Sequence, residues 1–187
     1  MQKDFLTTIP TDLPIPVDDG ACDGLLNKNI PSVDLQSTKG VLIDPSTITG
    51  LLVIFCYPMT GRPGRLLPRG WIDTPGAAGC TPQNCSFRDR FIDLTNMDVT
   101  LFGLSAQTHT DQAEAVLRLK LPYTLLSDSD LKFTDSLNLP TFKIENLRLN
   151  KRVTLIVKDG IIKKYFYPVF PPDKNVEDVI NWISTNK

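Results

Sequence analysis

Two cysteines stand close together in a stretch whose residue types suit thiol chemistry. Cys80 and Cys85 belong to the run Gly79-Cys80-Thr81-Pro82-Gln83-Asn84-Cys85-Ser86-Phe87-Arg88-Asp89. Thr81 is a good N-cap and Pro82 a good first helical residue, so the run predicts a helix from Pro82 onward. The unpaired N–H groups at a helix start carry partial positive charge, which favours a thiolate over a thiol. We interpret Cys80 and Cys85 as a redox pair.

The spacing of these cysteines leaves two geometries open. Within one α-helix their Cα atoms would lie about 8.6 Å apart, from a rise of about 7.5 Å and a turn of roughly 140°. A disulfide needs Cα atoms within about 7 Å, so the first turns would have to unwind on oxidation. If Thr81 instead caps the helix, Cys80 and Cys85 occupy the N′ and N4 positions, which touch each other.

The other two cysteines have simpler interpretations. Cys56 lies inside an apolar stretch, which predicts core packing. Cys22 lies in an irregular region and is expected to be an unpaired surface thiol. No Cys-x₂-Cys pair occurs, so no zinc site is expected.

Composition narrows the class of protein. The chain has 187 residues, a formal net charge of −1 and an isoelectric point of about 5.8, so we expect neither nucleic acid nor an acidic membrane as partner. No apolar run approaches the ~20 residues that span a bilayer. The first residues lack the charged-then-apolar order of a secretory signal, so we expect a cytoplasmic location, with the nucleus as alternative. In such reducing compartments a close cysteine pair is more often catalytic or metal-binding than structural.

Strand and helix patterns alternate along the chain. Strands are expected at residues 50–57, 99–104, 123–126, 152–157 and 161–167, and helices at 82–94, 111–119, 130–137 and 176–183. The last two strands form a hairpin through Asp159-Gly160. These patterns predict an α/β fold with a mixed sheet and helices on both faces, preceded by an irregular N-terminal arm. We expect the arm over residues 1–35 and the folded domain over 36–187.

Taken together, the motifs resemble those of a known family. The apolar strand ending in Tyr57-Pro58, the two-cysteine run and the later Arg152-Val153-Thr154 resemble a peroxiredoxin of the Q subgroup, also called the bacterioferritin-comigratory-protein type. The resemblance implies a thioredoxin-like fold and reduction of hydrogen peroxide or organic hydroperoxides without metal or bound cofactor. It also implies a monomer that is recycled by a thioredoxin-like or glutaredoxin-like dithiol protein.

The resemblance assigns roles residue by residue. Cys80 matches the peroxidatic cysteine, Cys85 the resolving cysteine of an intrachain disulfide, and Arg152 the arginine that supports the thiolate. The family places a threonine three residues before the reactive cysteine, where this chain has Ala77. Thr60 or Thr74 could supply the hydroxyl, and we prefer Thr60 because it follows the matching Tyr-Pro. Family behaviour also favours unwinding of the helix on oxidation.

Two other functions suit a cysteine pair. A protein thiol–disulfide oxidoreductase on the same fold usually carries Cys-x-x-Cys, which this chain lacks. A redox sensor or binding module would use the pair as a switch. The long loop at 59–79, with Arg62, Arg65 and Arg69, could shape substrate access or be a solvated insertion.

Overall fold

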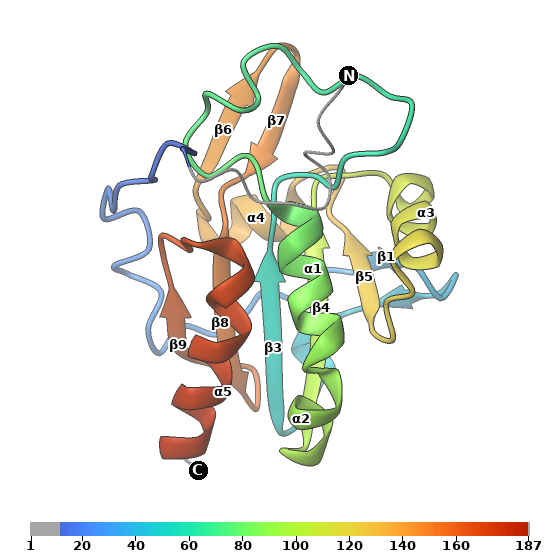
Figure 1. Ribbon diagram of the computed structural model, residues 1–187. Coiled ribbons are helices and arrows are strands. Elements are labelled where there is room, and N and C mark those ends of the chain that lie inside the picture. Colours follow the sequence, from blue (N-terminus) through green and yellow to red (C-terminus); the bar gives the residue numbers. More distant parts are fainter. Residues whose placement is uncertain (1–11, 187) are drawn as a thin grey trace.

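A computed structural model describes residues 12–186 of the chain (Figure 1). Over these residues, seven strands form one mixed sheet in the order β2-β1-β5-β4-β3-β8-β9. The strands are β1 (Leu35–Ser37), β2 (Leu42–Ile43), β3 (Leu51–Cys56), β4 (Val99–Ser105), β5 (Thr124–Ser127), β8 (Val153–Lys158) and β9 (Ile161–Phe166). The neighbours β3, β4 and β5 run parallel, whereas β8 pairs antiparallel with β3. This arrangement confirms the predicted α/β fold with a central mixed sheet.

Helices cover the sheet. They are α1 (Cys80–Asp89), α2 (Phe91–Asn96), α3 (His109–Leu119), α4 (Lys132–Leu137) and α5 (Asn175–Thr185), with short 3₁₀ turns η1 (Pro45–Thr47) and η2 (Pro172–Lys174). In Figure 1, α1, α2 and α5 lie in front of the strands, and α1 begins near the end of the sheet to which β3 points. The start of α1 therefore lies at the carboxyl edge of the parallel strands.

Residue alternation along β3 explains why both faces are covered. Val53, Phe55 and Tyr57 belong to the core beneath α1, α2 and α5, whereas Leu52 and Ile54 belong to the core on the opposite face. All five side chains are fully buried. A strand buried on both faces reads as a continuous apolar run, as this one does.

An aromatic stack fixes α1 onto the sheet. The ring of Phe87 in α1 lies parallel to that of Phe55, with centroids 4.2 Å apart and an interplanar angle of 7°. Both side chains are fully buried, so the stack contributes both apolar burial and aromatic contact. This contact sets the distance of α1 from β3.

The strands predicted from the sequence do not include those of two short hairpins. One is β1–β2, and the other is a separate pair, β6 (Thr141–Ile144) with β7 (Leu147–Asn150). The second projects beyond the carboxyl edge of the main sheet, next to the loop 59–79 (Figure 1). Both are too short for a period-2 pattern to stand out.

The N-terminal arm packs against the back of the sheet. Leu25 and Ile30 are buried there, and Asn29 forms an isolated antiparallel bridge with Ile161. Cys22 is a free thiol that is only 1% exposed, so the expectation of a surface thiol is wrong. The arm buries this sulfur because it contributes to the second core instead of lying free in solvent. The expected arm residues 1–11 lie outside the described residues.

Among residues 12–186, no helix has the length and apolar character needed to cross a bilayer.

The close packing of β4 against its neighbours gives a test of the fold. Gly103 pairs with Phe55 on one side and Leu125 on the other. A Cβ atom at Gly103 would lie 2.6 Å from Leu125 Cδ2 and 2.8 Å from Phe55 Cζ. We predict that Gly103→Ala lowers the free energy of unfolding by roughly 1–3 kcal/mol through overpacking, measured by urea denaturation.

Gly24→Ala is the matched control. At Gly24 the nearest atom to an added Cβ would be Lys28 Nζ at 3.7 Å, so stability should stay within about 0.5 kcal/mol of wild type. Equal stability of the two variants would contradict the packing described for β4.

Candidate active site

The Cys80 sulfur lies where the carboxyl end of β3 meets the first turn of α1. β3 ends at Cys56, and shortly afterwards the backbone N–H of Met59 donates to Cys80 Sγ at 3.4 Å. Cys80 is the first residue of α1 and is only 3% exposed. The predicted cap at Thr81 is wrong, because the helix begins one residue before it.

A glycine makes this helix start possible. Gly79 occupies the N-cap position with φ of 97°, a backbone conformation that favours glycine. A Cβ at Gly79 would lie 2.5 Å from Cγ of Pro172 in η2. The absence of a side chain therefore lets η2 pack against the turn that carries Cys80.

Strand register brings Arg152 to the same place. Across the β3–β8 pair, Cys56 lies opposite Val153. Arg152, which precedes Val153, therefore lies at the carboxyl edge of β3, where the chain turns toward Met59. Pairing of these central strands thus positions a residue 72 positions away from Cys80 in the sequence.

The Arg152 guanidinium contacts the sulfur directly. Its Nη2 atom lies 3.2 Å from Cys80 Sγ and also donates to the carbonyls of Ala77 at 3.2 Å and Ala78 at 2.6 Å. Arg152 is 3% exposed, and its Nε and Nη1 atoms have no hydrogen-bond partner among the described residues. The carbonyls just before α1 hold the cation against the thiol.

Burial and charge act in opposite directions on this pair. Burial raises the pKa of the Cys80 thiol above its ordinary value, whereas the Arg152 cation and the Met59 N–H lower it, and burial dominates. Burial likewise lowers the pKa of Arg152, while the neighbouring sulfur raises it. The net direction for Cys80 is opposite to that expected from a helix start alone, because the closed pocket excludes the water that would solvate a thiolate. Among the groups that lower the pKa of Cys80 in this form, Arg152 has the largest effect.

A small cavity lies beside the sulfur. It measures about 10 Å³ and is lined by residues that include Cys80, Thr81, Trp71 and Leu67. This is close to the smallest space that holds a water molecule, so the Cys80 sulfur has very little free space beside it in the closed form.

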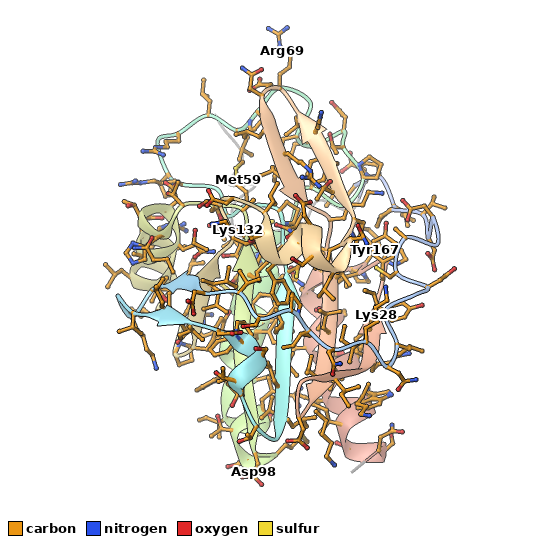
Figure 2. All side chains as sticks on the ribbon, turned by 180° about the vertical axis from the view of Figure 1, so that it is seen from behind. Lys28, Met59, Arg69, Asp98, Lys132 and Tyr167 are labelled. Atoms are coloured by element: carbon orange, nitrogen blue, oxygen red, sulfur yellow. The ribbon has the colours of Figure 1, made fainter. Side chains whose placement is uncertain are left out.

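A wider pocket of about 540 Å³ adjoins this cavity, and Met59, Gly61 and Leu67 line both. The loop 59–79 provides much of its wall, including Arg62, Arg65 and Arg69. Figure 2 shows Arg69 at the outer tip of the molecule, with Met59 nearer the sheet. The loop with three arginines is therefore next to the Cys80 cavity.

Cys85 does not contact Cys80. Both are free thiols in α1, with Cys85 half-buried. A spacing of five positions in a regular helix places their Cα atoms about 8.6 Å apart, beyond disulfide range. The geometry in which Cys80 and Cys85 touch as N′ and N4 does not occur, because Cys80 lies inside the helix. Burial raises the pKa of Cys85, and the nearby Arg88 cation opposes that shift.

The two candidate hydroxyls bond elsewhere. Thr60 Oγ1 donates to Gln107 Oε1 at 3.1 Å, and Thr74 Oγ1 donates to the Gly70 carbonyl at 2.8 Å. In the described part of the chain neither hydroxyl has a hydrogen bond to Cys80 Sγ. Thr60 is buried and directly follows Met59, whose N–H contacts the sulfur, so its role remains a prediction.

Sequence patterns missed several groups around Cys80. The Met59 N–H and the Ala77 carbonyl are backbone groups, which residue types do not reveal. Asn84 donates from Nδ2 to the Cys80 carbonyl at 2.9 Å, a contact that i, i+4 spacing could have indicated. The hydroxyl of Tyr123 contacts Asn84 from a distant part of the sequence and had no local signal.

Among residues 12–186, no three His, Cys, Asp or Glu side chains come together as a candidate metal site.

Comparison with known proteins agrees with this geometry. The family described as Redoxin matches residues 26–180, which include both cysteines of α1 and Arg152. The chloroplastic peroxiredoxin Q of Suaeda salsa is 22% identical over 156 residues, which cover 83% of this chain and 65% of the relative. That of Sedum lineare is 23% identical over 158 residues, covering 84% of this chain and 76% of the relative. The chain thus spans about two thirds to three quarters of the length of these two relatives.

Solved structures show the same fold. Peroxidoxin BcpB from Mycobacterium tuberculosis has a TM-score of 0.71 at 19% identity, covering 87% of this chain and 97% of that chain. Peroxiredoxin Q from Xanthomonas campestris has a TM-score of 0.65 at 16% identity, covering 94% of this chain and 99% of that chain. The thioredoxin-like architecture is thereby confirmed, and the chain belongs to the redoxin family, in the peroxiredoxin Q group that its cysteine motif predicted.

Proposed function

We propose that this protein is a thiol-dependent peroxidase that reduces hydrogen peroxide and organic hydroperoxides through Cys80. The observation that carries the proposal is the 3.2 Å contact between Cys80 Sγ and the buried guanidinium of Arg152, at a helix start beside a cavity. A bacterioferritin comigratory protein from Xanthomonas campestris has been studied for alkyl peroxide reduction, which supports the proposal by family likeness.

The first step follows from these groups. The Cys80 sulfur attacks one oxygen of the hydroperoxide, the O–O bond breaks, and the other oxygen leaves as water or an alcohol. The thiol proton ends on the leaving oxygen, and Cys80 becomes a sulfenic acid. Arg152 provides a fixed positive charge where negative charge develops on sulfur and oxygen, and a water-excluded site strengthens this effect.

The second step involves Cys85. Its thiol attacks the sulfenic sulfur, a disulfide forms, and water is released. The distance between the cysteines requires the first turns of α1 to unwind before this attack. A thioredoxin-like or glutaredoxin-like dithiol protein then reduces the disulfide and restores both thiols.

The wider pocket supports organic hydroperoxides as substrates. The cavity at Cys80 is too small for the substituent of an organic hydroperoxide, whereas the adjoining space beside Leu66, Leu67 and Leu147 can hold an apolar one. The loop 59–79 would then shape substrate access.

Replacing the two cysteines separately tests the two steps. We predict that Cys80→Ser abolishes consumption of peroxide, because serine is not a nucleophile toward the O–O bond in this setting. Cys85→Ser should keep the first oxidation of Cys80 but form no intrachain disulfide. Rapid mixing with peroxide, followed by trapping of sulfenic acid and mass spectrometry, measures both.

The same experiment separates the rival functions. Slow oxidation of Cys80 in the wild-type protein would contradict a peroxidase. So would consumption of peroxide that is unaffected by Cys80→Ser. The first of these results would favour a redox sensor.

Removing the charge of Arg152 tests electrostatic support of the sulfur. We predict that Arg152→Met lowers the second-order rate constant for peroxide by about 10²–10³, the cost typical of losing one group that stabilises the transition state. Arg148→Met is the control, because Arg148 is exposed and pairs with Asp135 near the β6–β7 hairpin. If both variants react at the wild-type rate, Arg152 has no part in the first step.

A further inference from the structure

The hydroxyl of Tyr123 holds a residue that lies between the two cysteines. Tyr123 OH contacts Asn84 at two points, donating to its backbone carbonyl at 2.8 Å and lying 3.2 Å from its Oδ1. Asn84 is fully buried and Tyr123 is only 5% exposed. The ring of Tyr123 packs edge-on against Phe55, with centroids 5.7 Å apart. The ring of Tyr123 thus packs against the sheet, while its hydroxyl bonds to Asn84 in α1.

Asn84 connects the Tyr123 hydroxyl to the first turn of α1, which carries Cys80. Its Nδ2 donates to the carbonyl of Cys80 at 2.9 Å, so Tyr123, Asn84 and Cys80 form one hydrogen-bonded chain. The neighbouring Gln83 is also tied to another element, because its Nε2 donates to Asn175 Oδ1 at 3.2 Å. The helical segment between the cysteines is thus held from both sides.

Disulfide formation has to break these contacts. Cys80 and Cys85 come within bonding distance only when the intervening helix unwinds, and unwinding moves Asn84 away from Tyr123 and from the Cys80 carbonyl. The chain of hydrogen bonds therefore stabilises the form in which Cys80 faces Arg152, and it opposes the form in which Cys80 meets Cys85.

We propose that Tyr123 is a positioning residue that, through Asn84, keeps the Cys80 turn helical and sets the balance between the closed and unwound forms. The effect on turnover rests on the proposed peroxidase function, whereas the effect on the Cys80–Cys85 disulfide does not. The buried contacts of the Tyr123 hydroxyl with Asn84 carry the proposal.

The expected size of the shift between the closed and unwound forms follows from the buried groups of Asn84 that lose a hydrogen-bond partner. Tyr123→Phe keeps the ring but removes the donor, so the Asn84 carbonyl and Oδ1 lose this contact in the closed form and reach water in the unwound form. A buried polar group without a partner costs about 1–3 kcal/mol, which corresponds to a shift of roughly five- to 150-fold toward the unwound form.

Equilibration with dithiothreitol tests the proposal without peroxide. Protein dithiol and oxidised dithiothreitol exchange two electrons and two protons to give protein disulfide and dithiothreitol. We expect the equilibrium constant for the Cys80–Cys85 disulfide to rise about five- to 150-fold in Tyr123→Phe, because only the dithiol form loses a contact. An equal loss of stability in both forms would leave this constant unchanged.

Tyr165→Phe is the matched control. It removes a hydroxyl from β9, where Tyr165 OH lies 3.5 Å from Asp23 Oδ1, far from the contacts of α1. Its disulfide constant should equal that of wild type. A second variant, Asn84→Leu, removes both side-chain contacts and should act in the same direction as Tyr123→Phe.

Hydrogen exchange and peroxide treatment complete the test. In reduced Tyr123→Phe, amides of α1 should exchange faster than in wild type, while those of β3 remain protected. With excess hydroperoxide, a second oxidation converts Cys80 sulfenic acid to sulfinic acid and the hydroperoxide to an alcohol. Tyr123→Phe should give less sulfinic acid and more disulfide than wild type.

The outcomes distinguish the two proposals. An unchanged disulfide constant in Tyr123→Phe would overturn the role of Tyr123 whatever the activity. A raised constant in a protein whose Cys80 does not react with hydroperoxide would support the role of Tyr123 and overturn the proposed function.

Discussion

The contact between the Cys80 sulfur and the Arg152 guanidinium is the interaction on which the site depends. It joins the first residue of α1 to the residue before β8, and three features of the fold make it possible. The antiparallel register of β3 and β8 places Arg152 at the carboxyl edge of the sheet. The bare backbone of Gly79 lets η2 approach, and the carbonyls of Ala77 and Ala78 orient the guanidinium.

Closure of the site has opposing effects on the proposed chemistry. Exclusion of water raises the pKa of Cys80, which disfavours the thiolate, but it also strengthens the attraction between a thiolate and Arg152. A regular helix start orients the sulfur for the first step and keeps Cys85 out of reach for the second. The two steps thus need two forms of α1, and the contacts of Asn84 lie where one converts into the other.

The sequence predicted the central strands, a helix that includes Cys85 and the place of Arg152 near Cys80, because apolar runs and a family motif mark them directly. It failed where the determining contact is remote or lies in the backbone. Thr81 looked like a cap, but the positive φ of Gly79 and its approach to Pro172 start the helix earlier. Cys22 looked exposed because nothing in its neighbourhood shows that the arm folds onto the sheet. Tyr123 had no signal at all, since its partner lies 39 residues away.

The pKa of Cys80 tests the central interaction most directly. The pH dependence of alkylation by iodoacetamide, read at the Cys80 peptide by mass spectrometry, gives this pKa in the wild-type protein and in the Arg152→Met variant. Because the guanidinium favours the thiolate, we expect a higher pKa of Cys80 in the variant than in the wild type. The same pKa in both proteins would show that Arg152 does not act on the sulfur and would contradict the role given to this contact.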